Sequence, residues 1–215
     1  TKKTSETYFD VHLGKGDEIA AHSFNFAGDG STLKSKSVME YGTITSGSIT
    51  DGTAGTSAAA TDSSEAVMVR TVSYKLLTPS YTAATKKTSE TYFDVHLGKG
   101  DEIAAHSFNF AGDGTTLKSK SVMEYGTITT GSITDGTAGT SAAATASSEA
   151  VMVRTLSYKM TDGIDVNTTI EYSEVGNKTS ETYFDVHLGK GDEIAAHSFN
   201  FAGDGTTLKS KSVME

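Results

Sequence analysis

The chain has 215 residues, with 18 Lys or Arg against 27 Asp or Glu, so its formal net charge at pH 7 is −9. This acidic balance without a basic stripe excludes nucleic acid as an expected partner, because phosphate binding needs clustered cations. The chain has no Cys, which excludes disulfides and cysteine catalysis. No apolar run approaches the length of a membrane-spanning helix, so no membrane insertion is expected.

One long stretch of sequence recurs three times along the chain. Residues 4–75 align with residues 88–159, and only four of the 72 positions differ. The third copy, residues 179–215, repeats part of the second without a change. The copies are joined by residues 76–87 and by the longer segment 160–178. The resulting units of about 84–91 residues have the size of small domains rather than of solenoid repeats.

The repeats predict the domain organisation. We expect residues 1–84 to form repeat 1, residues 85–178 to form repeat 2 and residues 179–215 to form a partial repeat 3. An alternative framing gives a fragment at 1–40 and units at 41–124 and 125–215. Half a β-domain cannot bury its own apolar face. The incomplete repeat is therefore expected either to belong to a longer array or to be completed by strand exchange with a neighbouring molecule.

The first predicted elements are two strands, at residues 8–13 and 18–26, joined in a hairpin with Lys15-Gly16 at its tip. A two-residue loop pairs Phe9 with His22 and makes one face of the hairpin mostly apolar and the other mostly polar. This separation predicts an antiparallel two-layer sandwich with one face in water.

Two more strands are expected later in each unit. The first covers residues 32–45 and is expected either to bend near Gly42 or to divide there into two strands. The second covers residues 65–75, where Val67 and Val69 favour a strand over a helix because they branch at Cβ. Residues 47–64 are rich in Gly, Ser, Thr and Ala and are expected to form a loop that holds a short strand at 48–50.

The connector between the second and third copies carries the alternating pattern of an amphipathic strand. Its apolar or β-forming positions are Ile164, Val166, Thr168, Ile170 and Tyr172. The first connector is shorter and contains the only Pro, which cannot donate to a sheet. These five residues are therefore the candidate strand-exchange segment. The alternative is that the two connectors differ only in length and set the angle between domains.

Carboxylates gather at the predicted turns, where irregular backbone also offers the oxygen ligands that calcium prefers. The candidate calcium ligands are Asp17, Glu18, Asp29, Asp162 and Asp165. Ordinary Asp-Gly turn chemistry is the alternative. No cofactor other than calcium is expected.

Histidine and serine motifs predict no catalysis. The hairpin register separates His12 from His22, and His12 beside Asp10 is expected to be a surface pair rather than a metal site. No phosphate-binding glycine loop and no nucleophile elbow is present. We therefore expect that the protein is not an enzyme.

Two sequons for N-linked glycosylation, at Asn167 and Asn177, lie in the second connector. In a secreted chain both would be candidate glycan-attachment sites, so glycans are expected partners.

Near-identical units of about 90 residues, high Thr, Ser and Gly content, acidic balance and absence of Cys together resemble the tandem Ig-like β-sandwich repeats of bacterial surface adhesins and extracellular fibres. The resemblance implies an extracellular or cell-surface location and a load-bearing role, and it transfers no site residue. The first hypothesis is a structural subunit that self-associates into an extracellular filament. The alternatives are an adhesin stalk stiffened by calcium and a carbohydrate-binding module that uses Tyr8 and Tyr41.

Overall fold

The computed structural model describes residues 2–42, 55–126, 139–145, 147, 149–160, 177–187 and 189–214. The strands of the first copy are β1 (Ser5–Asp10), β2 (Ile19–Phe26), β3 (Leu33–Gly42), β4 (Thr56–Ser57) and β5 (Val67–Leu76). Those of the second copy are β6 (Thr85–Asp94), β7 (Ile103–Phe110), β8 (Leu117–Gly126), β9 (Thr140–Ser141) and β10 (Val151–Lys159). Those of the third are β11 (Lys178–Asp185), β12 (Ile194–Phe201) and β13 (Leu208–Val213). Two 3-10 turns, Ala58–Ala60 and Ala142–Ala144, are the only helical elements in these ranges.

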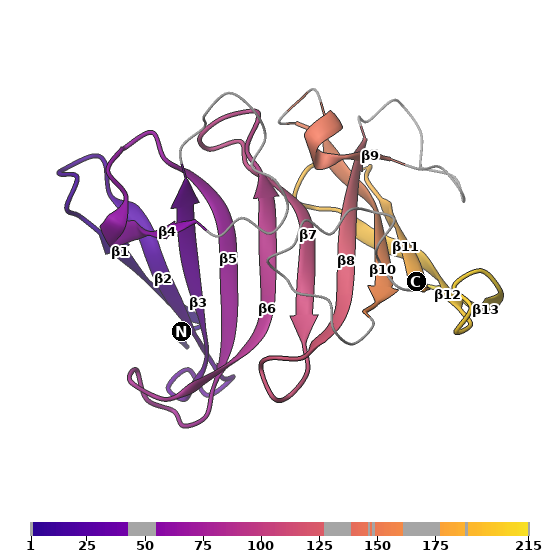
Figure 1. Cartoon of the computed structure of the whole chain (residues 1–215), viewed down its shortest axis with the longest axis horizontal. Helices are drawn as coiled ribbons and strands as arrows, with labels where there is room; N and C mark the ends of the chain where they lie inside the picture. Colours follow the sequence, from indigo (N-terminus) through magenta and orange to yellow (C-terminus); the bar gives the residue numbers. More distant parts are fainter. Residues whose placement is uncertain are drawn as a thin grey trace.

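The expected all-β antiparallel architecture is confirmed, but the strands form one open sheet. The order in the sheet is β1-β2-β3-β5-β6-β7-β8-β10-β11-β12-β13, with β4 attached to β3 and β9 attached to β8. Figure 1 shows β3, β5, β6, β7 and β8 side by side in the middle, with the strands at either end turned away by the twist of the sheet. The two stacked layers of the expected sandwich are not formed by the described residues.

The first hairpin departs from its predicted register. Tyr8 pairs with His22, Phe9 pairs with Ala20, and a bulge lies between the two pairs. β1 ends at Asp10, whose carboxylate accepts a hydrogen bond from the backbone N–H of His12 at 3.0 Å. The eight residues 11–18 then form the connection in place of a two-residue loop. A one-residue slip moves every side chain to the other face, so Tyr8 rather than Phe9 shares a face with His22.

The conformation of the connection between β1 and β2 explains why the predicted hairpin register is wrong. Gly14 and Gly16 adopt positive φ angles of 105° and 97°, which side chains with a Cβ rarely adopt. The N–H of Gly14 donates to the carbonyl of Val11, and the N–H of Asp17 donates to the carbonyl of Gly14. These consecutive turns remove Val11 and Leu13 from the predicted strand.

The other expected strands are confirmed in part. β3 covers most of residues 32–45, and β5 shows that residues 65–75 form a strand rather than a helix. The expected loop contains β4 and the turn Ala58–Ala60, whereas the predicted short strand at 48–50 lies outside the described residues.

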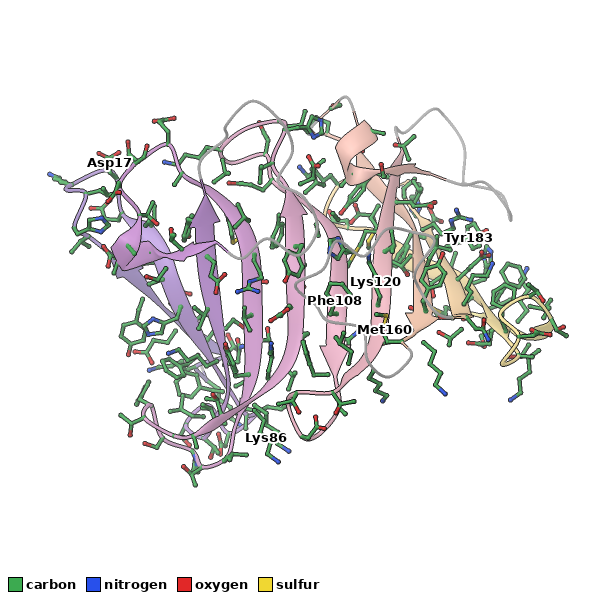
Figure 2. The ribbon with its side chains drawn as sticks, viewed as in Figure 1. Asp17, Lys86, Phe108, Lys120, Met160 and Tyr183 are labelled. Atoms are coloured by element: carbon green, nitrogen blue, oxygen red, sulfur yellow. The ribbon has the colours of Figure 1, made fainter. Side chains whose placement is uncertain are left out.

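The two faces of the sheet carry different side chains. One face carries a row of small polar residues across successive strands: Thr7, Ser23, Ser37, Ser73, Ser89, Asn109 and Ser119. The other face carries larger side chains: in each copy a Tyr stacks on a His of the next strand, as Tyr92 does on His106 at 5.0 Å between ring centroids. Phe108 lies beside this pair, and Lys120 lies over the Phe108 ring at 5.4 Å. In Figure 2 Phe108, Lys120 and Met160 lie together near the centre of the sheet.

The pairing register advances by the same step at each junction between copies. The row that starts at Tyr8 runs through His22 and Val72 and reaches Glu90, two positions before Tyr92, the equivalent of Tyr8. The row that starts at Tyr92 reaches Glu181, two positions before Tyr183, in the same way. Each repeat is therefore added to the sheet with one constant stagger.

Candidate assembly site at the repeat junctions

The strongest constellation of charged side chains lies where one copy meets the next. Arg70 stands on β5 between Glu40 on β3 and Tyr92 on β6. Its Nε donates to Glu40 Oε2 at 2.8 Å, and its Nη2 donates to Glu40 Oε1 at 2.9 Å. Its Nη1 donates to the Tyr92 hydroxyl at 3.2 Å and lies 3.6 Å from Glu90 Oε1. Lys87 also contacts Glu90, at 2.7 Å.

This arrangement places one cation of the first repeat against a carboxylate of the second. Burial alone would lower the pKa of Arg70, but the hydrogen bond with Tyr92 and the charges of Glu40 and Glu90 raise it. A two-pronged Arg–carboxylate contact fixes both distance and orientation. Arg70 therefore fixes the register of β3, β5 and β6 together.

The second junction repeats the first. Arg154 Nε donates to Glu124 Oε2 at 2.8 Å, and its Nη1 donates to the Tyr183 hydroxyl at 3.4 Å. Lys178 contacts Glu181 at 2.6 Å, and Arg154 Nη1 lies 3.9 Å from the same carboxylate. The geometry is thus a property of the repeat rather than of one position in the chain.

A cluster of apolar side chains packs across each junction at one end of the paired strands. Val67 and Val69 of β5 are buried against Val95 of the second copy, and Phe93 packs on this cluster. At the second junction Val151 and Val153 are buried against Val186, and Phe184 packs on them. The two valines at the start of each β5-type strand therefore pack on the next repeat.

A carboxylate completes each junction by capping the bulged part of the strand. Glu102, in the loop before β7, accepts a hydrogen bond from the backbone N–H of Met68 at 3.1 Å. Glu193 does the same for Met152 at 3.1 Å. Their equivalent in the first copy is Glu18, one of the calcium candidates. Glu18 accepts from the N–H of Gly16 at 3.0 Å, the same bond within the loop that Glu102 also accepts from Gly100 and Glu193 from Gly191.

The outer strand β1 exposes the residues that the junctions bury. Phe9 is 58% exposed and Val11 is 65% exposed, whereas Val95, the equivalent of Val11, is 0% exposed. Tyr8 is 39% exposed and its equivalent Tyr92 is 3% exposed. The local sequence is the same, so the difference comes from the β5-type strand that lies beside β6 and not beside β1.

The outer strand β13 shows the same contrast. Val213 is 67% exposed, whereas its equivalent Val122 is 6% exposed and pairs with Leu156 of β10. Leu208 is also exposed, whereas Leu33 is buried in a cluster with Leu76 of β5. Both outer strands of the sheet therefore present surfaces that fit a β5-type strand.

The predicted calcium ligands are not brought together. Asp17 and Glu18 lie in the loop before β2, and Asp29 lies in the loop after β2, at the opposite end of that strand; Figure 2 shows Asp17 at the tip of its loop. Asp162 and Asp165 lie outside the described residues. Within the parts of the chain that the structure describes, no group of three or more Asp, Glu or His side chains is placed to hold a metal ion.

Asp29 instead organises a turn. Its Oδ1 accepts from the backbone N–H of Ser31 and from that of Thr32, each at 2.9 Å. Its Oδ2 accepts from the Thr32 hydroxyl. These bonds, led by that of the Thr32 hydroxyl, lower the pKa of Asp29 to about 2. Asp113 and Asp204 form the same turn in the later copies, with the same lowered pKa of about 2.

Acid titration should detect these three turns. We expect the carboxyl resonances of Asp29, Asp113 and Asp204 to titrate near pH 2 rather than near the ordinary value of 3.8. Because the folded pKa is lowered, the stabilisation is present above the unfolded pKa and is lost as the pH falls through about 2. Carbon-detected NMR titration measures each pKa. Values near 3.8 at all three turns would contradict the assignment.

The expected surface pair of Asp10 and His12 is present. His12 Nδ1 contacts the Asp10 carboxylate, and Nε2 lies 2.7 Å from the carbonyl oxygen of Thr61. The hydrogen bond with Asp10 raises the pKa of His12. Nδ1 thus holds the loop to the end of β1, and Nε2 ties it to the segment before β5.

The remaining predicted residues lie only partly within the described ranges. The strand-exchange segment Ile164, Val166, Thr168, Ile170 and Tyr172 and the sequon residue Asn167 lie outside the described residues. Asn177 is exposed, and its side-chain amide donates to the carbonyl of Gly203. Tyr41, expected to be an exposed sugar-binding residue, is buried and donates its hydroxyl to the carbonyl of Ala20 at 2.7 Å.

The sequence reasoning missed Arg70 and Arg154. The available signal was one long cation at the centre of a strand of Val, Met and Thr, because a charge in such a strand needs a carboxylate partner when it is buried.

Comparison with known proteins identifies no relative: the chain matches no protein-family model, no curated protein and no solved structure. None of the described helical turns has the length and apolar character of a membrane span.

Proposed function

We propose that the protein is a structural subunit of an extracellular filament or surface fibre built from near-identical β-repeats. One observation carries the proposal: the sheet continues through both repeat junctions with the same contacts and the same stagger. A sheet of this kind grows by adding repeats without changing its geometry. Heterologous, head-to-tail contacts of this type generate open filaments when they do not close into a ring.

The open edges support self-association. An outer strand presents unpaired N–H and C=O groups, and natural proteins usually protect such edges. Here Phe9 of β1 and Val11, just after β1, are exposed, and β13 exposes Leu208 and Val213. Apolar residues beside an unpaired edge favour addition of another strand.

The contacts at the junctions favour the filament over the two alternatives. In a calcium-stiffened stalk, carboxylates at the junctions would coordinate calcium. Here Glu90 contacts Lys87, and Glu102 accepts a hydrogen bond from the backbone N–H of Met68. In a carbohydrate module, Tyr41 would be exposed, whereas it is buried. The extracellular location rests on the resemblance, in unit size and composition, to the repeats of surface adhesins and extracellular fibres.

Native molar mass tests the proposal. Light scattering combined with negative-stain imaging of the same purified sample should show a polydisperse mass far above that of the 22.5 kDa chain, together with uniform fibres. Addition of EDTA should leave the fibres intact, because the proposed contacts are hydrogen bonds, ion pairs and apolar packing. A single mass of one chain at every concentration, with no fibres, would overturn the filament.

A further inference from the structure

We propose that the free edge of β1 is an acceptor site for one extended strand with the sequence of β5, contributed by another repeat unit. The inference rests on the proposed function and names the joint through which the sheet would grow. Its basis is internal: the same acceptor sequence occurs three times, and two of the three copies already hold such a strand. The remaining acceptor strand is β1 of the first copy, and no β5-type strand lies beside it.

The occupied copies define the register of the added strand. At the first junction Arg70 pairs with Tyr92, Thr71 with Thr91 and Val72 with Glu90. Transferred to the first copy, these positions place the incoming Arg opposite Tyr8 and the incoming Val opposite Glu6. The strand runs antiparallel to β1, as β5 does to β6.

Specific side chains of the acceptor match those of the incoming strand. Phe9 and Val11 correspond to Phe93 and Val95, which pack against the two valines of β5. Filling this surface removes the exposed apolar area that β1 carries. Strand addition generally draws affinity from main-chain bonds and specificity from alternate side-chain sites.

The charged anchor of the acceptor is already in place. Glu6 contacts Lys3 at 3.3 Å and accepts from the Tyr8 hydroxyl at 3.0 Å, as Glu90 does from Lys87 and Tyr92. Glu6 also accepts from the Tyr81 hydroxyl at 2.9 Å. The incoming Arg supplies the interaction with this carboxylate that Arg70 makes with Glu90.

The carboxylate of Glu18 supplies a second polar anchor. Its equivalents Glu102 and Glu193 each hold a backbone N–H of the adjoining strand at 3.1 Å. Glu18 accepts from the N–H of Gly16 within its own loop, as Glu102 does from Gly100 and Glu193 does from Gly191 in addition to their bonds across the junction. Because both occupied acceptors use this carboxylate in the same way, the incoming strand is expected to recruit Glu18.

The test uses the full chain and a synthetic peptide of residues 65–76. Isothermal titration calorimetry should detect saturable binding, and the peptide with Arg70→Ala should bind at least about tenfold more weakly. A scrambled peptide of the same composition controls for non-specific apolar association. Equal binding of the native and scrambled peptides, or no binding, would overturn the inference.

Matched variants of the chain locate the site. The double variant Phe9→Ser and Val11→Ser should lose at least about tenfold in affinity for the peptide while its melting temperature stays unchanged, because both side chains are exposed. The same changes at Phe93 and Val95 should lower the melting temperature, because that acceptor is already filled. Unchanged peptide binding by the Phe9 and Val11 variant would exclude β1 as the site.

The outcome separates this inference from the filament proposal. Saturable peptide binding by a chain that never forms fibres would support the acceptor site and reject the filament. Fibres that form equally well with the Phe9 and Val11 variant would support the filament and reject this joint. In that case the copies would have to associate by a contact that does not use the β5 sequence.

Discussion

Replacement of Arg70 by Ala is expected to lower the free energy of unfolding by about 3–5 kcal/mol, the range for breaking a buried ion pair. The side chain of Glu90 is 3% exposed, so removal of Arg70 leaves a carboxylate in a poorly solvated position with only Lys87 as its ionic partner. Glu40 loses both of its guanidinium bonds in the same variant. Urea denaturation followed by circular dichroism measures the change.

Two further variants show whether the loss comes from the junction. Lys34→Ala removes an exposed cation of β3 and should change stability by less than about 0.5 kcal/mol. A double-mutant cycle between Arg70 and Glu40 isolates their coupling from other effects of each substitution. A loss below about 1 kcal/mol for Arg70→Ala would contradict a central role of this residue in joining the repeats.

Phe108→Ala is expected to destabilise the protein by about 3–5 kcal/mol, as for other large-to-small changes at buried aromatic residues. Phe108 is 1% exposed and packs with Tyr92, Phe110 and Met160. Its ring also lies next to His106. Deletion of the ring leaves a cavity in the middle of the sheet, where the neighbouring strands on both sides restrict collapse.

The repeats provide a matched control for this substitution. Phe199 occupies the equivalent position in the third copy, where it is less buried and lies next to the outer strand β13. Phe199→Ala should therefore cost less than Phe108→Ala, although the neighbouring sequence is the same. Equal losses in thermal and chemical denaturation would show that burial by neighbouring repeats does not set the energetics.

The sequence predicts the class of fold and most of the strands. The β-branched residues Val67 and Val69 correctly favour a strand at β5 over a helix. The alternation of apolar and polar residues also identifies β2. These features are local, because they depend on the conformation that each side chain favours and on the period of two along a strand.

Register and layer number are not local. The predicted register of the first hairpin is wrong, and the described residues do not form the expected second layer. The register of the first hairpin depends on the carboxylate of Asp10, which bonds the N–H of His12 and ends the strand early. Two layers are expected from the sequence because the mostly apolar face of the hairpin would pack against a second sheet. Instead, the large side chains of that face pack against one another, as Tyr92, His106 and Phe108 do.

The junction site could be predicted only in part. Near-identity of the copies shows that every copy has the same surface, but it does not show which strand of one copy lies beside which strand of the next. Arg70 within an apolar strand indicates a buried ion pair, whereas its partners Glu40 and Glu90 lie 30 and 20 positions away in the chain. Only the strand order identifies them.

The most direct test of the continuous sheet is a disulfide across the first junction. The chain has no native Cys, and Thr71 and Thr91 are directly opposite each other on β5 and β6. The double variant Thr71→Cys and Thr91→Cys should form an intramolecular disulfide under mild oxidation in dilute solution, because opposed residues of paired strands lie within disulfide reach. The pair Thr71→Cys and Ser107→Cys, two strands apart, should keep its thiols. Free thiols in the first variant, with the fold intact, would contradict a sheet that runs through the repeats.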